Sequence, residues 1–324
     1  MRRSARLWCY QLPMDSGVVL RGRRMAERRG YIAELHEGKR SSLGEIAPLP
    51  GFSVESHEQA GQQAERALAD WVRGQAFVET GLYPSVAFGL SMAGTELTGI
   101  LPAAGQFRTA PLLNGETDIG LQPAQRLAKL KVGRAEPWQD AAQVNQYLGI
   151  YPNLMLRLDA NQAWSLVQAR AFCRAITPSH ISRITFIEEP CQRPADSLSF
   201  ADESGMALAW DETLQQAVRQ PGFRLESLGR AAAIVIKPTL IGSVQRCANL
   251  IRHAQILGMQ AVISSSLESS LGLTQLARLS GWLLPDSVPG LDTLNLFQSQ
   301  LEVPWPGSTL PIQLLHAQTP VWQS

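Results

Sequence analysis

The sequence predicts an α/β fold, a (β/α) barrel preceded by an α+β capping domain. Three observations lead to this prediction. Short apolar runs recur through the second half of the chain, and each ends in polar or charged residues. The runs are separated by stretches long enough for a crossover helix, as in a repeated strand–helix unit. Residues 1 to about 100 follow a different pattern, with antiparallel strand segments and an amphipathic helix.

The capping domain is expected over residues 1–100. Residues 7–12 and 31–36 are typical of antiparallel strands, whereas residues 56–75 have the apolar spacing of a helix that begins near Ser56. Between the two strands lies a run of arginines, which we interpret as a solvated hairpin or loop. The arginines of this run are Arg21, Arg23, Arg24, Arg28 and Arg29.

Two further segments of the capping domain, residues 15–18 and 44–53, are rich in turn residues and are predicted to be loops. They carry apolar side chains, among them Val18 and Phe52, that solvent exposure alone explains poorly. A lid over a pocket would explain them. The alternative is that these loops pack onto their own domain.

The barrel is expected over residues 101–300. Five apolar runs closed by Pro, Gly or Asn are typical of buried parallel strands. They cover residues 130–133, 156–161, 186–190, 208–212 and 234–238. A strand at 109–114 is expected to precede them, and segments at 260–266 and 288–292 to complete eight. Residues 301–324 are predicted to return across the surface as extended chain.

The spacing of the runs places their charged ends together. Successive ends lie 28, 29, 23 and 26 residues apart, counted from Lys131 to Asp159, Glu188, Asp211 and Lys237. In a (β/α) barrel the carboxyl ends of all strands meet at one face. Two lysines and three carboxylates are therefore expected to line one mouth of the barrel.

Composition limits the kind of partner. The chain has 324 residues, a formal net charge of +1 and 18% charged residues, so it offers no strong field for nucleic acid or an anionic membrane. No apolar run reaches the length of a membrane span. Four cysteines without paired spacing are typical of a reducing compartment. We expect a cytoplasmic monomer or weak homo-oligomer that acts on a small molecule.

Three converging carboxylates without a histidine are ligands for a hard cation, and Mg²⁺ is the first candidate. Asp159 is the first predicted ligand, and Asn161, on the same side of its strand, is predicted either to support a metal ligand or to contact the substrate. Each remaining acidic pair, Glu188–Glu189 and Asp211–Glu212, offers one ligand. The sequence alone does not choose between the members of these pairs.

A lysine at a buried strand end, near a cation and a second lysine, has its charged form disfavoured and can act as a base. With a divalent cation holding a substrate carboxylate, such a base can remove the α-proton while the cation stabilises the enediolate. The second lysine can take the other proton or hold developing charge. The alternative is that both lysines form ion pairs with the same carboxylates.

These residues resemble the enolase superfamily, in its muconate-lactonizing subgroup, over nearly the whole chain. The subgroup has a Lys-x-Lys pair on the second strand, which matches Lys129-Leu130-Lys131. The resemblance implies an enolase-type barrel in which Lys131 is catalytic and Lys237 is the opposing lysine. It also implies that Mg²⁺, or Mn²⁺, is bound by one acidic residue on each of three successive strands. These ligands are Asp159, Glu188 and Asp211.

Within the subgroup, further segments resemble the o-succinylbenzoate synthase family. They are residues 44–53, 84–89, 158–161, 236–240, 264–272 and 289–293. The resemblance implies a metal-dependent lyase of menaquinone biosynthesis that dehydrates 2-succinyl-6-hydroxy-2,4-cyclohexadiene-1-carboxylate to 2-succinylbenzoate with syn geometry. Lys131 would be base and then acid, and Lys237 would stabilise the enediolate. The implied substrate-binding residues are Lys129, Asn161, Ser264, Ser265 and Gly290.

Two other functions are alternatives. N-acylamino acid racemases and dipeptide epimerases of the same superfamily use the same two lysines. Dipeptide epimerases carry an Asp-x-Asp at the eighth strand end, which the segment 289–293 lacks. A barrel that only binds metabolites would be expected to have lost at least one of the five charged positions, and all five are present.

Overall fold

The computed structural model describes residues 2–15, 17–20, 23–103, 105, 107–113, 121 and 125–324. The chain divides into two compact units. Unit 1 comprises Met1–Thr109, Ile236–Ile251 and Ile263–Ser324, and unit 2 comprises Ala110–Val235 and Arg252–Val262. Within the described residues, no helix is long and apolar enough to cross a membrane. The domain boundaries expected from the sequence stay a prediction.

Unit 1 is built on an antiparallel sheet of four strands in the order β15-β1-β4-β5. The predicted strands at 7–12 and 31–36 are confirmed, and both are longer than expected. Each residue of β1 pairs with one of β4, from Arg3 opposite Glu37 to Pro13 opposite Glu27. The strands are β1 (Arg3–Pro13), β4 (Glu27–Glu37), β5 (Arg40–Ile46) and β15 (Thr319–Gln323).

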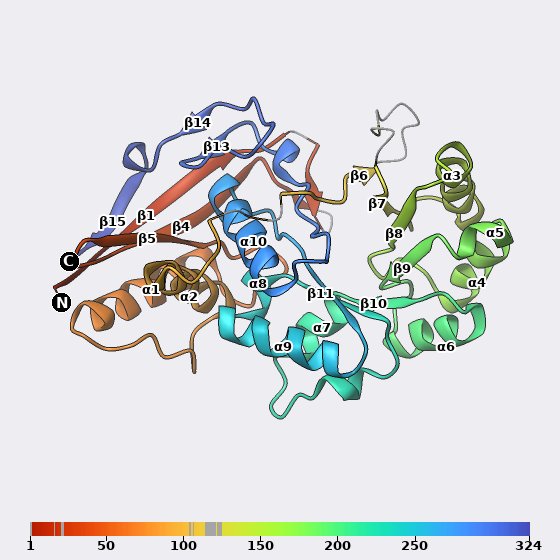
Figure 1. Cartoon of the computed structure of the whole chain (residues 1–324), viewed down its shortest axis with the longest axis horizontal. Coiled ribbons are helices and arrows are strands. Elements are labelled where there is room, and N and C mark those ends of the chain that lie inside the picture. The colour runs from red at the N-terminus through yellow and green to blue at the C-terminus, as the bar shows by residue number, and fades with distance from the viewer. Residues whose placement is uncertain are drawn as a thin grey trace. The chain divides into compact units, whose positions relative to one another are not determined.

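Two helices cover one face of this sheet, α1 (His57–Val72) and α2 (Pro84–Thr98) (Figure 1). The predicted helix is α1, and Ser56 caps it through a reciprocal capping box with Gln59. Apolar side chains of β1, β4 and β5 pack against α1 and α2. Most residues of α2 are buried, because it packs against β5 on one side and α8 on another. The sequence reasoning did not predict α2, since it lacks a single apolar stripe.

The prediction of a solvated hairpin or loop for the arginine run is confirmed for its hairpin and for the exposed Arg24 and Arg29, and it is wrong for Arg28, which is buried. Val19–Leu20 (β2) and Arg23–Arg24 (β3) form a short antiparallel hairpin, and Arg28 lies within β4 with 1% of its surface exposed. The Arg28 guanidinium donates to the carbonyl oxygens of Ala47, Pro48 and Leu267 at 2.6–2.8 Å. These carbonyl partners allow the guanidinium to be buried, and because they lie outside the arginine run, its charge pattern does not predict the burial. Arg21 lies outside the described residues.

The segment 44–53 is a loop only in part. Gly44–Ile46 form the end of β5, which pairs with β4 up to Tyr31 opposite Ile46, and the loop begins after them. The turn residues of this segment predict a loop from Gly44 onward. Glycine at position 44 instead allows β5 and α2 to pack closely, because a Cβ at Gly44 would lie 2.0 Å from the carbonyl oxygen of Gly89 in α2.

Unit 2 is built on a curled sheet whose strands run in chain order from β6 to β12. The strand pairs from β6 to β11 are parallel, which confirms the predicted α/β barrel architecture. The strands are β6 (Leu112–Leu113), β7 (Leu127–Lys131), β8 (Met155–Asp159), β9 (Ile184–Glu188), β10 (Leu208–Trp210), β11 (Ala233–Ile236) and β12 (Gln260–Ile263). Asn114, the last residue of the strand predicted at 109–114, lies outside the described residues.

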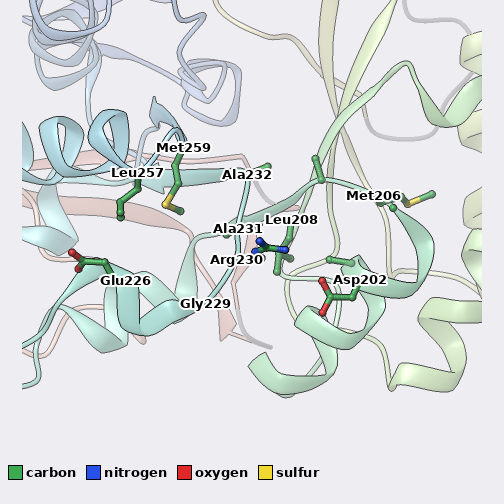
Figure 2. Close-up of a pocket in the computed structure, with 13 residues that line it drawn as sticks. Asp202, Met206, Leu208, Glu226, Gly229, Arg230, Ala231, Ala232, Leu257 and Met259 are labelled. Atoms are coloured by element: carbon green, nitrogen blue, oxygen red, sulfur yellow. The ribbon is translucent and has the colours of Figure 1, made fainter.

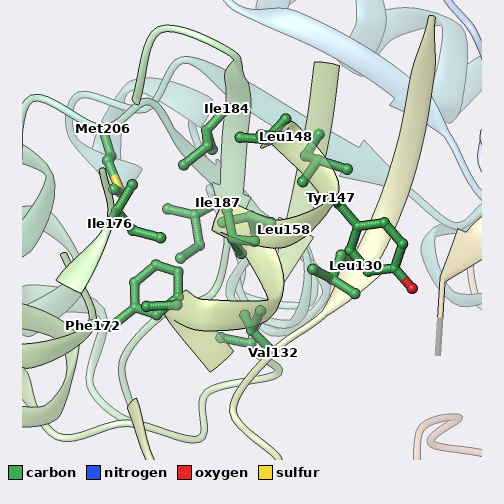
Figure 3. Packing of buried hydrophobic residues seen from close by; sticks show 14 of the residues in the cluster. Leu130, Val132, Tyr147, Leu148, Leu158, Phe172, Ile176, Ile184, Ile187 and Met206 are labelled. Carbon is green, nitrogen blue, oxygen red and sulfur yellow. The ribbon is translucent and has the colours of Figure 1, made fainter. Parts of the chain in front are cut away.

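Helices follow the strands of unit 2 and bury their outer faces. Leu130, Leu158 and Ile187 of β7, β8 and β9 pack against Leu148 and Phe172 of the following helices (Figure 3). This cluster fixes the strands and therefore the residues at their ends. The elements between the strands are α3 (Pro137–Ile150), α4 (Leu166–Ala175), α5 (Pro178–Ile181), α6 (Pro194–Ser204), α7 (Glu212–Ala217) and the 3₁₀ helix η1 (Leu225–Leu228).

The last barrel segments belong largely to unit 1. The short segment predicted at 288–292 as the eighth strand and its following loop pairs through one parallel bridge, between Ser264 and Gly290, so the strand is shorter than predicted. Proline and glycine at 289 and 290 limit its pairing. The remaining elements are α8 (Pro238–Ile241), α9 (Val244–Ile256), α10 (Ser270–Leu283), η2 (Leu294–Leu296), β13 (Gln300–Leu301), β14 (Ile312–Gln313) and η3 (Leu315–Ala317).

Candidate active site

The charged residues of unit 2 lie side by side because their strands are in register. Lys131 of β7 is opposite Asp159 of β8, and Asp159 is opposite Glu188 of β9. Glu188 is opposite Ala209 of β10, two residues before Asp211. All four side chains therefore project from the carboxyl edge of the sheet, where the ligand sites of parallel sheets lie.

Lys129 bridges two of the carboxylates. Its Nζ lies 2.7 Å from Oδ2 of Asp159 and 2.6 Å from Oε2 of Glu188, and its side chain is 15% exposed. Burial alone would lower the pKa of this ammonium, but the two carboxylates outweigh burial and hold that pKa above its usual value. Lys129 is thus an ion-pair partner inside the acidic cluster, and the substrate-binding role that the family resemblance implies for it stays a prediction.

Lys131 lies at the exposed side of the same cluster. Its Nζ is 2.6 Å from Oδ2 of Asp159 and 2.6 Å from Oδ1 of Asn161. The amide of Asn161 donates in turn to Oε1 of Glu212 at 3.1 Å. Lys131 is therefore held by two oxygen acceptors while 21% of its side-chain surface remains open to solvent. A lysine held in this way is oriented and reachable by a substrate.

The structure separates the two acidic residues at the end of β9. Glu188 faces Asp159 and Lys129, whereas Glu189 turns toward the segment after β10. Burial raises the pKa of Glu188, and the nearby Asp159 and Asp211 carboxylates act in the same direction against Lys129. In the next pair, Asp211 accepts from Gln215 and Glu212 accepts from Asn161. The charge of Asp211 also acts on Lys129 and Glu188, so both members of that pair border the cluster.

No three His, Cys, Asp or Glu side chains among the described residues form a ready-made cation site. The donor chemistry nevertheless fits a hard divalent cation. Asp159, Glu188 and Asp211 supply only oxygen donors, are at most 2% exposed, and lie at the carboxyl ends of the adjacent strands β8, β9 and β10. Their mutual repulsion needs positive charge nearby, and the Lys129 ammonium supplies it between Asp159 and Glu188.

Four other predicted residues lie in unit 1. Lys237 follows β11 directly and begins α8, and the Ser264 amide donates to the carbonyl of Ile236 at 2.9 Å. The Ser264 hydroxyl donates to the carbonyl of Gly290 at 3.1 Å, and so does the Ser265 amide at 3.0 Å. A Cβ at Gly290 would lie 2.9 Å from the Ser264 hydroxyl. These residues therefore form one group at neighbouring strand ends.

The two predicted lid residues differ in burial. Val18 is 7% exposed and accepts a hydrogen bond from the Met25 amide, whereas Phe52 is half-buried in a turn closed by its amide and the carbonyl of Leu49. Both contacts lie inside unit 1. Their role as a lid stays a prediction.

A cavity of about 530 Å³ in unit 2 lies away from these charged residues. Leu208, Ala232 and Met259 line it at the starts of β10, β11 and β12 (Figure 2). It therefore opens at the amino edge of the sheet. In (β/α) barrels this edge contributes to stability and the opposite edge carries catalysis.

Comparison with known proteins first defines the class. A family model described as "Enolase C-terminal domain-like" matches residues 123–295. The L-Ala-D/L-Glu epimerase of Bacillus subtilis has the same fold, with a TM-score of 0.77 and 18% identity over 91% of each chain. An o-succinylbenzoate synthase of Thermosynechococcus elongatus, complexed with Mg in the active site, has a TM-score of 0.73 and 24% identity, and the match covers 91% of this chain and 94% of that one. The fold and the charged strand ends thus define a barrel of the enolase type.

The sequence comparison defines the family within that class. A model described as "MenC, N-terminal domain" matches residues 2–97. An o-succinylbenzoate synthase of Vibrio cholerae is 54% identical over 99% of this chain and 98% of its own length. That of Pectobacterium atrosepticum is 49% identical over 99% and 100%. The chain belongs to the o-succinylbenzoate synthase family.

Proposed function

We propose that this chain dehydrates 2-succinyl-6-hydroxy-2,4-cyclohexadiene-1-carboxylate to 2-succinylbenzoate in the cytoplasm, as a step of menaquinone biosynthesis. The observation that carries the proposal is the reachable lysine, Lys131, held between Asp159 and Asn161 at the carboxyl edge of the sheet. Full-length identity of up to 54% to o-succinylbenzoate synthases supports the same reaction.

In the proposed reaction the ε-amine of Lys131 accepts the proton α to the substrate carboxylate. The resulting ammonium then gives a proton to the departing hydroxyl on the same face, so the products are the aromatic ring and water. Asn161 holds Lys131 at 2.6 Å and is itself fixed by Glu212. This arrangement keeps the amine in one position for both proton transfers.

Mg²⁺ held by Asp159, Glu188 and Asp211 would supply the positive charge that favours loss of the α-proton. Lys237 is proposed to stabilise the charge that develops on the ring from the side opposite Lys131. Ser264, Ser265 and Gly290 are proposed to bind the succinyl carboxylate. The resemblance to the family supports these three roles, and the grouping of Ser264 with Gly290 agrees with them.

The proposal is tested by following ultraviolet absorbance of the aromatic product with and without Mg²⁺. We expect Mg²⁺-dependent turnover that falls by about 10²- to 10⁴-fold or more in Lys131→Ala. Lys39→Ala, at an exposed lysine between β4 and β5, is the matched control and should keep wild-type turnover. No turnover by folded, Mg²⁺-loaded wild type would refute the proposal, and racemisation of an N-acylamino acid would then be assayed.

A further inference from the structure

Glu189 is a buried carboxylate that the proposed reaction does not use. It has no exposed surface, and its two oxygens accept four hydrogen bonds. Oε1 accepts from the amides of Asp211 at 2.9 Å and Thr213 at 2.7 Å. Oε2 accepts from the Thr213 hydroxyl at 2.9 Å and from Nε2 of Gln162 at 3.1 Å. One side chain at the end of β9 therefore ties together the segments that follow β8 and β10.

The backbone around Glu189 is unusual in the same place. Glu189, Asn161 and Gln162 have φ values of 44°, 46° and 62°, in the left-handed region that non-glycine residues rarely adopt. The two turns are joined by a 2.7 Å hydrogen bond from the Gln162 amide to the Glu189 carbonyl. Such conformations persist only where surrounding contacts impose them, and they cluster at functional sites.

We propose that Glu189 is a positioning residue for the cation site, an inference that rests on the proposed function. It holds the backbone of Asp211, the ligand after β10, and through Gln162 it holds the turn that carries Asn161. The two adjacent acidic residues at the end of β9, Glu188 and Glu189, thus have different roles. Glu188 faces the cation, and Glu189 fixes the loops on both sides of it.

The need for such a residue follows from charge. Asp159, Glu188 and Asp211 repel one another, and three carboxylates that are free to separate would bind a cation weakly. Asp211 lies at the start of α7 rather than inside a strand, so the sheet ladder does not hold it. Hydrogen bonds that the amides of Asp211 and Thr213 donate to Glu189 replace that ladder. Residues that orient metal ligands in this way typically raise metal affinity by about 10- to 100-fold.

The test is calorimetric titration of Mg²⁺ into the metal-free full-length protein. Glu189→Ala should raise the Kd for Mg²⁺ by about 10- to 100-fold. Glu189→Gln keeps an oxygen acceptor for the two backbone amides and should retain much tighter binding than Glu189→Ala. Glu188→Gln, which neutralises a ligand, should weaken binding more than Glu189→Gln. This order of Kd values for Mg²⁺ would distinguish a positioning role of Glu189 from direct ligation.

Asp140→Ala is the matched control for general damage to unit 2. Asp140 is also a buried carboxylate bonded to a backbone amide, that of Gly133 at 2.8 Å, but it supports the turn after β7, which carries no ligand. Its removal should leave the Kd for Mg²⁺ unchanged. If Glu189→Ala does not fold, Gln162→Ala, at a half-buried side chain, should weaken binding in the same direction.

The outcomes distinguish the inference from the function on which it rests. Wild-type affinity in folded Glu189→Ala, or equal weakening in Asp140→Ala, would overturn the positioning role and leave the synthase proposal standing. Wild type that binds no Mg²⁺ would overturn both. The spectrum of bound Mn²⁺ in electron paramagnetic resonance gives a second readout. We expect it to broaden in Glu189→Ala, because a displaced Asp211 makes the ligand set less uniform.

Discussion

Replacement of Arg28 by methionine is expected to destabilise the protein strongly. Methionine keeps much of the length of the side chain but removes a guanidinium that is 1% exposed. Three backbone carbonyls, those of Ala47, Pro48 and Leu267, would lose donors that now lie 2.6–2.8 Å away. Burial raises the pKa of the Glu268 carboxyl, and the same change would remove the Arg28 charge that acts against this rise.

The magnitude follows from these contacts. Hydrogen bonds from a charged donor contribute roughly 1.5–3 kcal/mol each. Three of them would give about 4.5–9 kcal/mol, which the desolvation of the guanidinium offsets by several kcal/mol. We therefore expect the free energy of unfolding to fall by about 3–5 kcal/mol. At about 2 °C per kcal/mol for a chain of this size, Tm should fall by roughly 6–10 °C.

The assay is thermal and urea unfolding followed by circular dichroism, with Arg29→Met as the control. Arg29 is the next residue in the same strand, but its side chain is 50% exposed and its ion pair with Glu27 spans 3.8 Å. Exposed pairs of this kind contribute roughly 0–1 kcal/mol, so the control should stay near wild type. An Arg28→Met variant as stable as Arg29→Met would refute the reasoning that these carbonyls depend on the guanidinium.

The remaining predictions concern the acidic cluster and a close packing contact. Lys129→Met leaves Asp159 and Glu188 without the ammonium between them, so the metal-free protein should lose about 3–5 kcal/mol. Mg²⁺ should raise the Tm of this variant more than that of wild type, and equal shifts would contradict the proposed cation site. Gly89→Ala should destabilise by about 1–3 kcal/mol although alanine favours helices, because its Cβ would lie 2.4 Å from Ile46 Cγ1. Gly149→Ala, in α3 with nothing within 4 Å of its Cβ, should instead be neutral or stabilising in the same melts.

Much of the fold could be predicted because parallel strands leave a local signal. The apolar runs ending at Lys131, Asp159 and Glu188 matched β7, β8 and β9 to within a few residues. Helix α1 could also be predicted, because its cap and apolar face lie within one short segment. Helix α2 could not be predicted, because it is buried on several sides and shows no separation into polar and apolar faces.

The errors have one physical cause, namely partners that are distant in sequence. The burial of Arg28 depends on carbonyls about 20 and 239 residues away. Gly44 belongs to a strand rather than a loop because α2 approaches it closely. No local pattern contains this information.

The sequence by itself determined the barrel class, its family and the charged strand ends, because the order and spacing of parallel strands decide which residues meet at one edge. Only the tertiary structure decided how those residues divide their roles. It placed Lys129 between Asp159 and Glu188, and it turned Glu189 toward Asp211 and Thr213. Glu188 and Glu189 are the same residue type, so the sequence does not distinguish them. The left-handed backbone of Glu189 at the end of β9 gives the two carboxylates different neighbours.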